Sequence, residues 1–247
     1  MQAIRLCAFL LCATAWAWGH DSEPINTEFA SPFALQSGNI QFGFQHFRDL
    51  ESFNVVAIEL EYGFAPRMQF SLIFPLTRLD DGENMHVRPG NIELGFRYLL
   101  AGGSNRRFAV SANAEAGLPT GDKQVSERAY ELGGAIHIDT HPAARVWTHT
   151  NLGYETPVAR FEEKEKSFFY RFAVMYEATE ELRPVLELVG VHDFESEETQ
   201  TAIVPELIVA PAKHWEIKAG LPLGITASTP DVGIQFQLTW KFGSIER

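Results

Sequence analysis

Apolar and polar side chains alternate at every second position along most of this chain, and that period limits its fold more than any other feature. Between Asn54 and Phe64 the even positions are apolar, whereas the odd positions after Val55 are alanine, glutamate or glycine. Successive side chains of a β-strand point to opposite faces, so such a segment has one apolar and one polar face. A helix would spread the same glutamates around its axis. The chain is therefore predicted to be all-β.

The same alternation predicts strands along the rest of the chain. The clear segments are 54–64, 67–75, 90–100, 107–118, 129–140, 168–177 and 232–242, and the weaker ones are 38–47, 144–154, 182–192, 201–210 and 213–222. Pro184 and Pro205 interrupt two of the weaker segments, because proline has no N–H to donate to a strand ladder. The pattern predicts about twelve strands, with ten as the alternative.

The predicted connections between these strands alternate between longer and shorter. The gaps 48–53, 76–89, 119–128, 155–166, 193–200 and 223–229 are longer, whereas Ala65-Pro66, 141–143 and Pro211-Ala212 are tight. Antiparallel strands send alternate connections to opposite ends of a sheet, so one end should carry the long loops and the other the turns. This sorting is typical of outer-membrane barrels.

The first residues have the pattern of a secretory signal. Arg5 is the only charge before Asp21, the run from Leu6 to Ala15 is apolar, and Ala15-Trp16-Ala17 provides a small-x-small cleavage pattern. We expect residues 1–19 to be removed and residues 20–247 to form a single outer-membrane domain. Both cysteines of the chain lie in the segment that is removed. Disulfides, zinc-thiolate sites and cysteine nucleophiles are therefore not expected in the mature protein.

Charge and hydropathy indicate which surroundings the two strand faces meet. Lys and Arg number 20 against 32 Asp and Glu, a net charge of -12, and no basic cluster is present, so nucleic acid is not an expected partner. After Pro24 no stretch approaches 18 consecutive apolar residues, so helical membrane spans are not expected. Phe, Leu, Ile and Tyr dominate one face of nearly every strand. A closed antiparallel β-barrel whose apolar face contacts outer-membrane lipids of a Gram-negative cell explains this face. A secreted sandwich or lipocalin-like protein is the alternative.

In such a barrel the opposite face lines a polar lumen. The charged residues assigned to it are Glu59, Glu61, Glu93, Glu115, Glu131, Glu187, Glu206, Glu216, Arg97, Arg171, Lys218 and Lys241. Charges inside a wall of low dielectric are costly unless they are paired or hydrated, so we expect ladders of acidic and basic groups around water or a narrow pore. The functional reading is a passage for small-molecule solutes with a field that favours cations or polar solutes. The alternative is that these charges fill and rigidify a closed lumen.

Enzymatic or metal chemistry is not expected. Strand parity places Ser111, His137, His149 and Asn151 inside the barrel, away from a lipid substrate, and no Gly-x-Ser-x-Gly sequence occurs. His137, Asp139 and His141 share one strand face, but His141-Pro142 is predicted to begin a turn and no fourth ligand is evident. We therefore predict that the protein is not an enzyme and uses no metal or other cofactor.

Two stretches resemble a known family. Gly90–Leu100 contains Gly-Asn-Ile-Glu-Leu-Gly-Phe-Arg-Tyr, and Glu115–Asp122 ends in Leu-Pro-Thr-Gly-Asp. They resemble the Gly-Asp-x-x-Leu-Gly-x-Lys-Tyr strand and the Leu-Pro-Thr-Gly-Asp strand end of a bacterial family of outer-membrane transporters, named after the meta-pathway of phenol degradation. Two departures are Asn91, where the family usually has Asp, and the extension Gly243–Arg247 beyond the last aromatic residue. The resemblance implies a barrel that moves small hydrophobic or aromatic compounds.

Together these observations predict a passive outer-membrane channel or transporter for small molecules. Two other functions stay open: a structural or adhesion barrel whose lumen is plugged, and an outer-membrane lipid-modifying enzyme.

Overall fold

The computed structural model describes residues 25–47, 54–80, 85–103, 107–125, 130–158 and 166–243. The strands are β1 Gly38–Phe47, β2 Asn54–Ala65, β3 Met68–Asp80, β4 Met85–Pro89, β5 Ile92–Gly102, β6 Phe108–Leu118, β7 Glu131–Ala143, β8 Val146–Pro157, β9 Ser167–Tyr176, β10 Leu182–Asp193, β11 Thr199–Ala212, β12 Trp215–Gly220, β13 Leu223–Gly224 and β14 Gly233–Phe242. Within these ranges no helix is long and apolar enough to cross a membrane. The predicted signal segment 1–19 lies outside the described residues.

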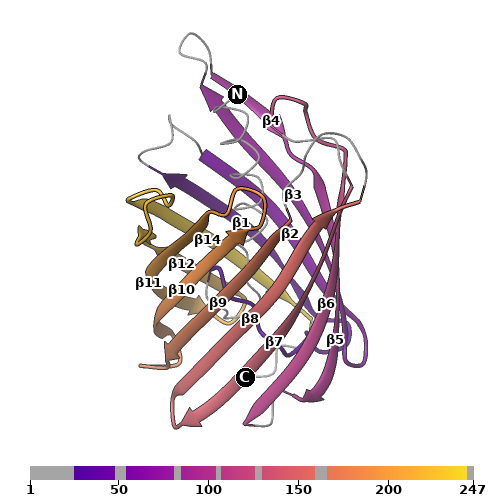
Figure 1. Cartoon of the computed structure of the whole chain (residues 1–247). Helices are drawn as coiled ribbons and strands as arrows, with labels where there is room; N and C mark the ends of the chain where they lie inside the picture. Colours follow the sequence, from indigo (N-terminus) through magenta and orange to yellow (C-terminus); the bar gives the residue numbers. More distant parts are fainter. Residues whose placement is uncertain are drawn as a thin grey trace.

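Twelve of these strands close into one antiparallel barrel, as the sequence predicts (Figure 1). They are β1 to β3, β5 to β12 and β14, and each pairs with its sequence neighbours within this set. β1 also pairs with β14, with Gly38 opposite Phe242, which joins the first strand of the barrel to the last. Because the sheet closes, the backbone N–H and C=O groups of every strand can bond to a neighbouring strand on both sides. A bilayer requires this, since it offers no water to bond them.

β4 and β13 stand apart from this ring. β4 continues the β3 ladder from Leu76 opposite Pro89 to Asp80 opposite Met85, and Figure 1 shows this hairpin rising beyond one end of the barrel. β13 pairs with Ala202 and Ile203 of β11. The predicted connection at 76–89 is therefore wrong, because β3 continues to Asp80 and β4 follows. Residues Leu76–Asp80 of β3 show no regular alternation, and β4 has only five residues, so this part gives a weaker signal than the long strands of the barrel.

Prolines do not interrupt the strands in which they occur. Pro184 lies opposite Leu207 and Pro205 opposite Leu186 in the β10–β11 ladder. The turn predicted to begin at His141-Pro142 is also wrong. β7 continues to Ala143, and a register shift between Thr140 and Ala143 accommodates the proline.

The connections differ between the two ends of the barrel, although less regularly than predicted. Residues 66–67, 144–145 and 213–214 form two-residue turns at the end where β1 begins and β14 finishes. Arg67 and Arg145 adopt positive φ angles of 68° and 65° in these turns. Most connections at the other end are longer, including 119–130 and 221–232. The gap predicted at 193–200 is an exception, because only 194–198 separate β10 from β11.

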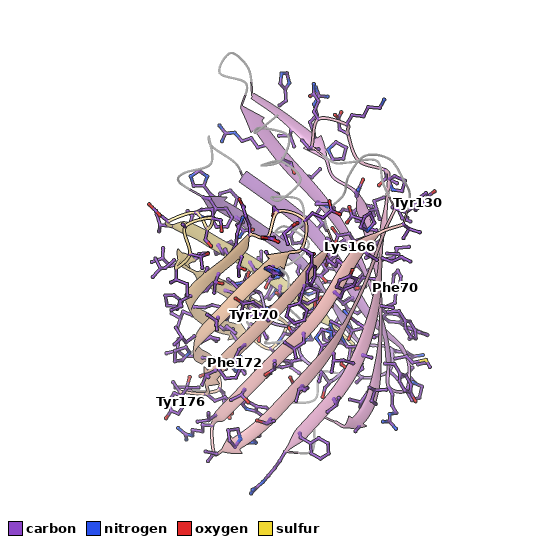
Figure 2. The ribbon with its side chains drawn as sticks, viewed as in Figure 1. Phe70, Tyr130, Lys166, Tyr170, Phe172 and Tyr176 are labelled. Carbon is purple, nitrogen blue, oxygen red and sulfur yellow. The ribbon has the colours of Figure 1, made fainter. Side chains whose placement is uncertain are left out.

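The two faces of the wall have opposite character. Phe96, Phe172 and Phe236 are 41%, 42% and 44% exposed, whereas the polar residues that alternate with them are mostly buried. Figure 2 shows Phe172 and Tyr176 along the outer surface of the barrel. A sandwich would bury these phenylalanines in a shared core, which excludes that alternative. The barrel is of the transmembrane type, with its apolar side chains on the outer surface.

Candidate channel lumen and its N-terminal plug

The barrel places all twelve charged residues predicted from parity on its inward face. Buried among them are Glu59, Glu61, Glu187, Glu206, Glu216, Arg97, Arg171, Lys218 and Lys241, and half-buried are Glu93, Glu115 and Glu131. Each lies on a strand where inward and outward side chains alternate, so the same periodicity that makes the outer face apolar places these charges inside.

A segment that precedes the first strand also lies inside the barrel, and the sequence did not predict it. Residues 25–33, here called the N-terminal plug, run across the lumen, and Figure 1 shows their indigo trace within the ring of strands. Ile25, Thr27 and Ala30 are 1%, 0% and 0% exposed. The chain therefore places a segment without regular secondary structure inside its own lumen.

Two carboxylates and an amide of the wall hold the beginning of the plug. The backbone N–H of Ile25 donates to Glu206 Oε2 (2.9 Å), and that of Asn26 donates to Glu187 Oε1 (3.2 Å). The Asn26 side-chain amide donates to Glu187 Oε2 (2.6 Å) and exchanges a pair of 3.1 Å hydrogen bonds with Gln235. These wall groups satisfy backbone donors that a segment without regular secondary structure cannot satisfy by itself.

Glu28 is the charged centre of the plug. Its carboxylate contacts the Arg97 guanidinium and lies 3.8 Å from both Arg171 Nη1 and His137 Nδ1. Asn151 clamps its backbone, accepting from the Glu28 N–H at 2.7 Å and donating to the Glu28 carbonyl at 2.8 Å. The Glu28 side chain is only 13% exposed. The plug thus inserts a carboxylate between basic groups of β5 and β9.

The rest of the plug rests on a histidine–aspartate pair. Asp139 accepts the backbone N–H of Ala30 at 2.8 Å, and its other oxygen is 2.9 Å from His149 Nδ1. The Phe29 ring stacks on the His149 ring, with centroids 4.4 Å apart. Asp139 and His149 contact the plug and each other, so their role here is to hold the plug in place.

Amide side chains extend this network from the plug into the wall. The Phe33 N–H donates to Gln69 Oε1 at 3.0 Å, and Gln69 Nε2 donates to Glu61 Oε1 at 3.0 Å. Gln41 Nε2 donates to the other Glu61 oxygen at 3.1 Å. Polar groups of β1, β2 and β3 are therefore linked to the plug in one chain of hydrogen bonds.

A separate group of charges stabilises the wall. Glu216 Oε1 is 2.7 Å from Lys241 Nζ and 3.3 Å from Arg183 Nη1. Arg183 was not among the predicted lumen residues. It precedes Glu187 by four positions on β10 and so has the same parity, a signal that would have identified it. The plug could not be predicted in this way, because apolar and polar residues do not alternate along it. Its hydrogen-bond partners lie 36 to 209 positions away in the sequence.

The plug adjoins cavities on two sides. One of about 430 Å³, including its open mouth, is lined by Glu28 together with Glu59, Glu93, Arg97 and Glu115. Another of about 640 Å³, measured in the same way, lies above Asn26 between β1, β9, β10, β11 and the connection after β12. The second is called the Arg171 pocket below. The lumen is therefore divided by the plug but is not solid.

The histidines that the sequence analysis considered as metal ligands, His137 and His141, both lie on β7. His141 stacks on Trp147, with centroids 4.2 Å apart, and His137 and Ser111 are buried on the inward face. No group of three His, Cys, Asp or Glu side chains able to hold a metal ion occurs within the described ranges.

Sequence comparison identifies no relative: no protein-family model matches the chain, and no curated protein does either. Structural comparison does give matches. The COG4313 outer membrane channel from Pseudomonas putida F1 has a TM-score of 0.73 at 10% identity, covering 90% of this chain and 100% of that one. The NanC porin has a TM-score of 0.60 at 6% identity, covering 84% and 100%. The KdgM porin has a TM-score of 0.58 at 11% identity, covering 84% and 99%. The chain shares the fold of outer-membrane channels.

Proposed function

We propose that this protein is an outer-membrane channel for small solutes, closed by its N-terminal plug. The observation that carries the proposal is the seating of residues 25–33 across a polar lumen by side chains of the wall. Hydrogen bonds and the Glu28 ion pair hold the plug, and water can replace these polar contacts when the plug leaves. Phe29 and Ala30 also pack against small apolar clusters of the wall. Departure of the plug would therefore leave a hydrated passage between two ends of the barrel. A plug held by a large apolar core would not be released so readily.

The direct test is a deletion of residues 25–33, with the protein purified in detergent and inserted into planar bilayers. Faster migration of the unboiled sample on a denaturing gel verifies that the variant is a closed barrel. We expect the deletion to conduct steadily, and the full-length protein to show brief stepwise openings. A folded deletion variant that carries no current at any voltage would contradict the proposal.

A permanently plugged structural or adhesion barrel is the second candidate, and the number of wall side chains bonded to the plug favours it. The same recordings distinguish the two functions. If the deletion conducts while the full-length protein stays silent at all voltages, the plug is permanent and the second candidate holds. Stepwise openings of the full-length protein favour the gated channel.

The charged lumen residues are proposed to set ion selectivity once the plug has left. Eight carboxylates face four basic groups in the predicted set, so the field should favour cations. Glu93 and Arg97 both line the 430 Å³ cavity beside the plug. In the deletion background, Glu93→Gln should reduce the cation preference measured as a reversal potential across a KCl gradient, and Arg97→Gln should increase it. Unchanged potentials in both variants would contradict this role.

We also propose that the protein is exported by an N-terminal signal, inserts into the outer membrane and belongs with the transporters named after the meta-pathway of phenol degradation. The strand and strand-end sequences at Gly90–Leu100 and Glu115–Asp122 support this family, whose name suggests small hydrophobic or aromatic solutes. Uptake of neutral aromatic solutes into proteoliposomes made with the deletion variant tests the solute class. Uptake no faster than into empty liposomes would contradict it.

A catalytic role is not part of the proposal. The buried His149 ring is covered by Phe29, and its partner Asp139 is engaged by the plug. A lipid-hydrolysis assay on the purified protein should give no product. Hydrolysis that disappears in His137→Ala or His149→Ala would overturn this part of the proposal.

A further inference from the structure

The Arg171 pocket combines apolar walls with polar lining groups. Its walls include Val189 and Val191 of β10, Ala202 and Val204 of β11, and Phe47 at the end of β1. The polar part of its lining comes from Asn26 of the plug and from Gln45, Gln200, Thr201, Thr229 and Gln235. The empty space at this site, including the open mouth, is about 640 Å³.

Arg171 is the one charged side chain among the described residues that line this pocket. It is 4% exposed, and its guanidinium carbon lies 4.8 Å from the centre of the Phe169 ring. On its other side, Nη1 lies 3.8 Å from Glu28 Oε1, beyond hydrogen-bond distance. Arg171 therefore lines the pocket and also lies close to the carboxylate of the plug.

We propose that the Arg171 pocket binds a small organic acid, that is, a molecule with an apolar body and a carboxylate group. The apolar body would lie against the valines, Ala202 and Phe47, and the carboxylate would accept hydrogen bonds from Arg171. A guanidinium fork matches a carboxylate in geometry and charge. A pure hydrocarbon makes no use of the charge on Arg171, and a sugar has no apolar body to lie against Val189, Val191 and Val204.

The pocket also couples such a ligand to the plug. A carboxylate bound to Arg171 competes with Glu28 for the same guanidinium, and the ligand body contacts Asn26. Binding of the acid therefore weakens the seat of the plug, so the solute itself promotes opening. This coupling rests on the proposed function, whereas the binding site does not.

Isothermal titration calorimetry of the full-length protein in detergent tests the site, with benzoate as the probe. Benzamide has the same ring without the charge, and acetate has the charge without the ring. We expect benzoate to bind at least about tenfold more tightly than either, since a charge-assisted hydrogen bond and apolar burial both contribute. Arg171→Gln should weaken benzoate binding at least about tenfold. Ala202→Phe, which fills the pocket without changing charge, should weaken it as strongly.

Arg183→Gln is the matched control, because Arg183 binds Glu216 in the wall and does not line the pocket. It should leave benzoate affinity unchanged. Absence of benzoate binding, equal affinity for benzamide or acetate, or unchanged affinity in Arg171→Gln would each overturn the inference. Gel migration of each variant verifies its fold.

Recordings in bilayers separate this inference from the proposed function. Benzoate that binds and raises the open fraction of the full-length protein supports both the site and its coupling. Benzoate that binds to a barrel whose deletion variant never conducts supports the site and refutes the channel. A conducting deletion variant, together with a full-length protein that binds no benzoate, refutes the site alone.

Discussion

Replacing Glu28 with glutamine tests how the plug is held, because it removes one charge and keeps the shape of the side chain. In the closed state the Glu28 carboxylate contacts Arg97 and lies 3.8 Å from Arg171 Nη1 and His137 Nδ1. Arg97 Nη1 also donates to the carbonyl oxygen of Phe29 at 2.8 Å, and this bond should survive the substitution. The variant therefore loses mainly the charge-assisted part of the contact.

The size of the effect of Glu28→Gln follows from the surroundings of the arginines in the closed and open channel. A hydrogen bond to a charged group contributes about 1.5–3 kcal/mol. In the seated variant Arg97 and Arg171 stay buried beside a neutral amide, whereas release of the plug returns them to water, so the substitution destabilises the closed state. We take about 2 kcal/mol for the weakened seat of the plug, which corresponds to roughly a 30-fold increase in the ratio of open to closed channels. The open fraction rises by the same factor as this ratio only while most channels are closed.

The assay is the open fraction of single channels in planar bilayers at fixed voltage and salt. Glu195→Gln is the matched control, because Glu195 is an exposed residue of the β10–β11 connection far along the chain from the plug. It should behave as the wild-type protein does. If Glu28→Gln opens no more often than wild type while the deletion of 25–33 conducts, the carboxylate does not hold the plug and the reasoning fails.

Four further substitutions test the barrel wall by urea unfolding in lipid vesicles. Phe172→Arg places a charge midway along β9 on the apolar face and should lower the free energy of unfolding by about 2–4 kcal/mol, whereas no change would mean that this face does not contact lipid. Gly153→Ala would bring a Cβ atom to 2.0 Å from the Phe169 ring, so a loss of about 1–3 kcal/mol is expected and an unchanged midpoint would show that the ring moves freely. Glu216→Gln should destabilise the barrel more than Lys241→Gln, because it leaves two cations without their shared carboxylate; the reverse order would refute that account.

Strand parity could predict most of the barrel because one repeating rule governs it. Glu59, Arg97 and Lys218 could be placed inside from their positions relative to Leu60, Phe96 and Ile217 alone. The same rule failed at β4 and at the proline of β7. β4 has only five residues, Met85–Pro89, which is a much shorter pattern than those of the barrel strands, and the proline of β7 stands at a register shift that no local pattern reveals.

The sequence by itself determined the all-β wall, its outward-facing apolar residues and the inward direction of its charges, because each depends on a local period of two. Only the tertiary structure decided that residues 25–33 occupy the lumen, that Glu28 lies between Arg97 and Arg171, and that an apolar pocket ends at Arg171. These features arise where side chains from strands far apart in the chain meet across the barrel. The residues that make these contacts lie far apart in the sequence, so no local pattern predicts them.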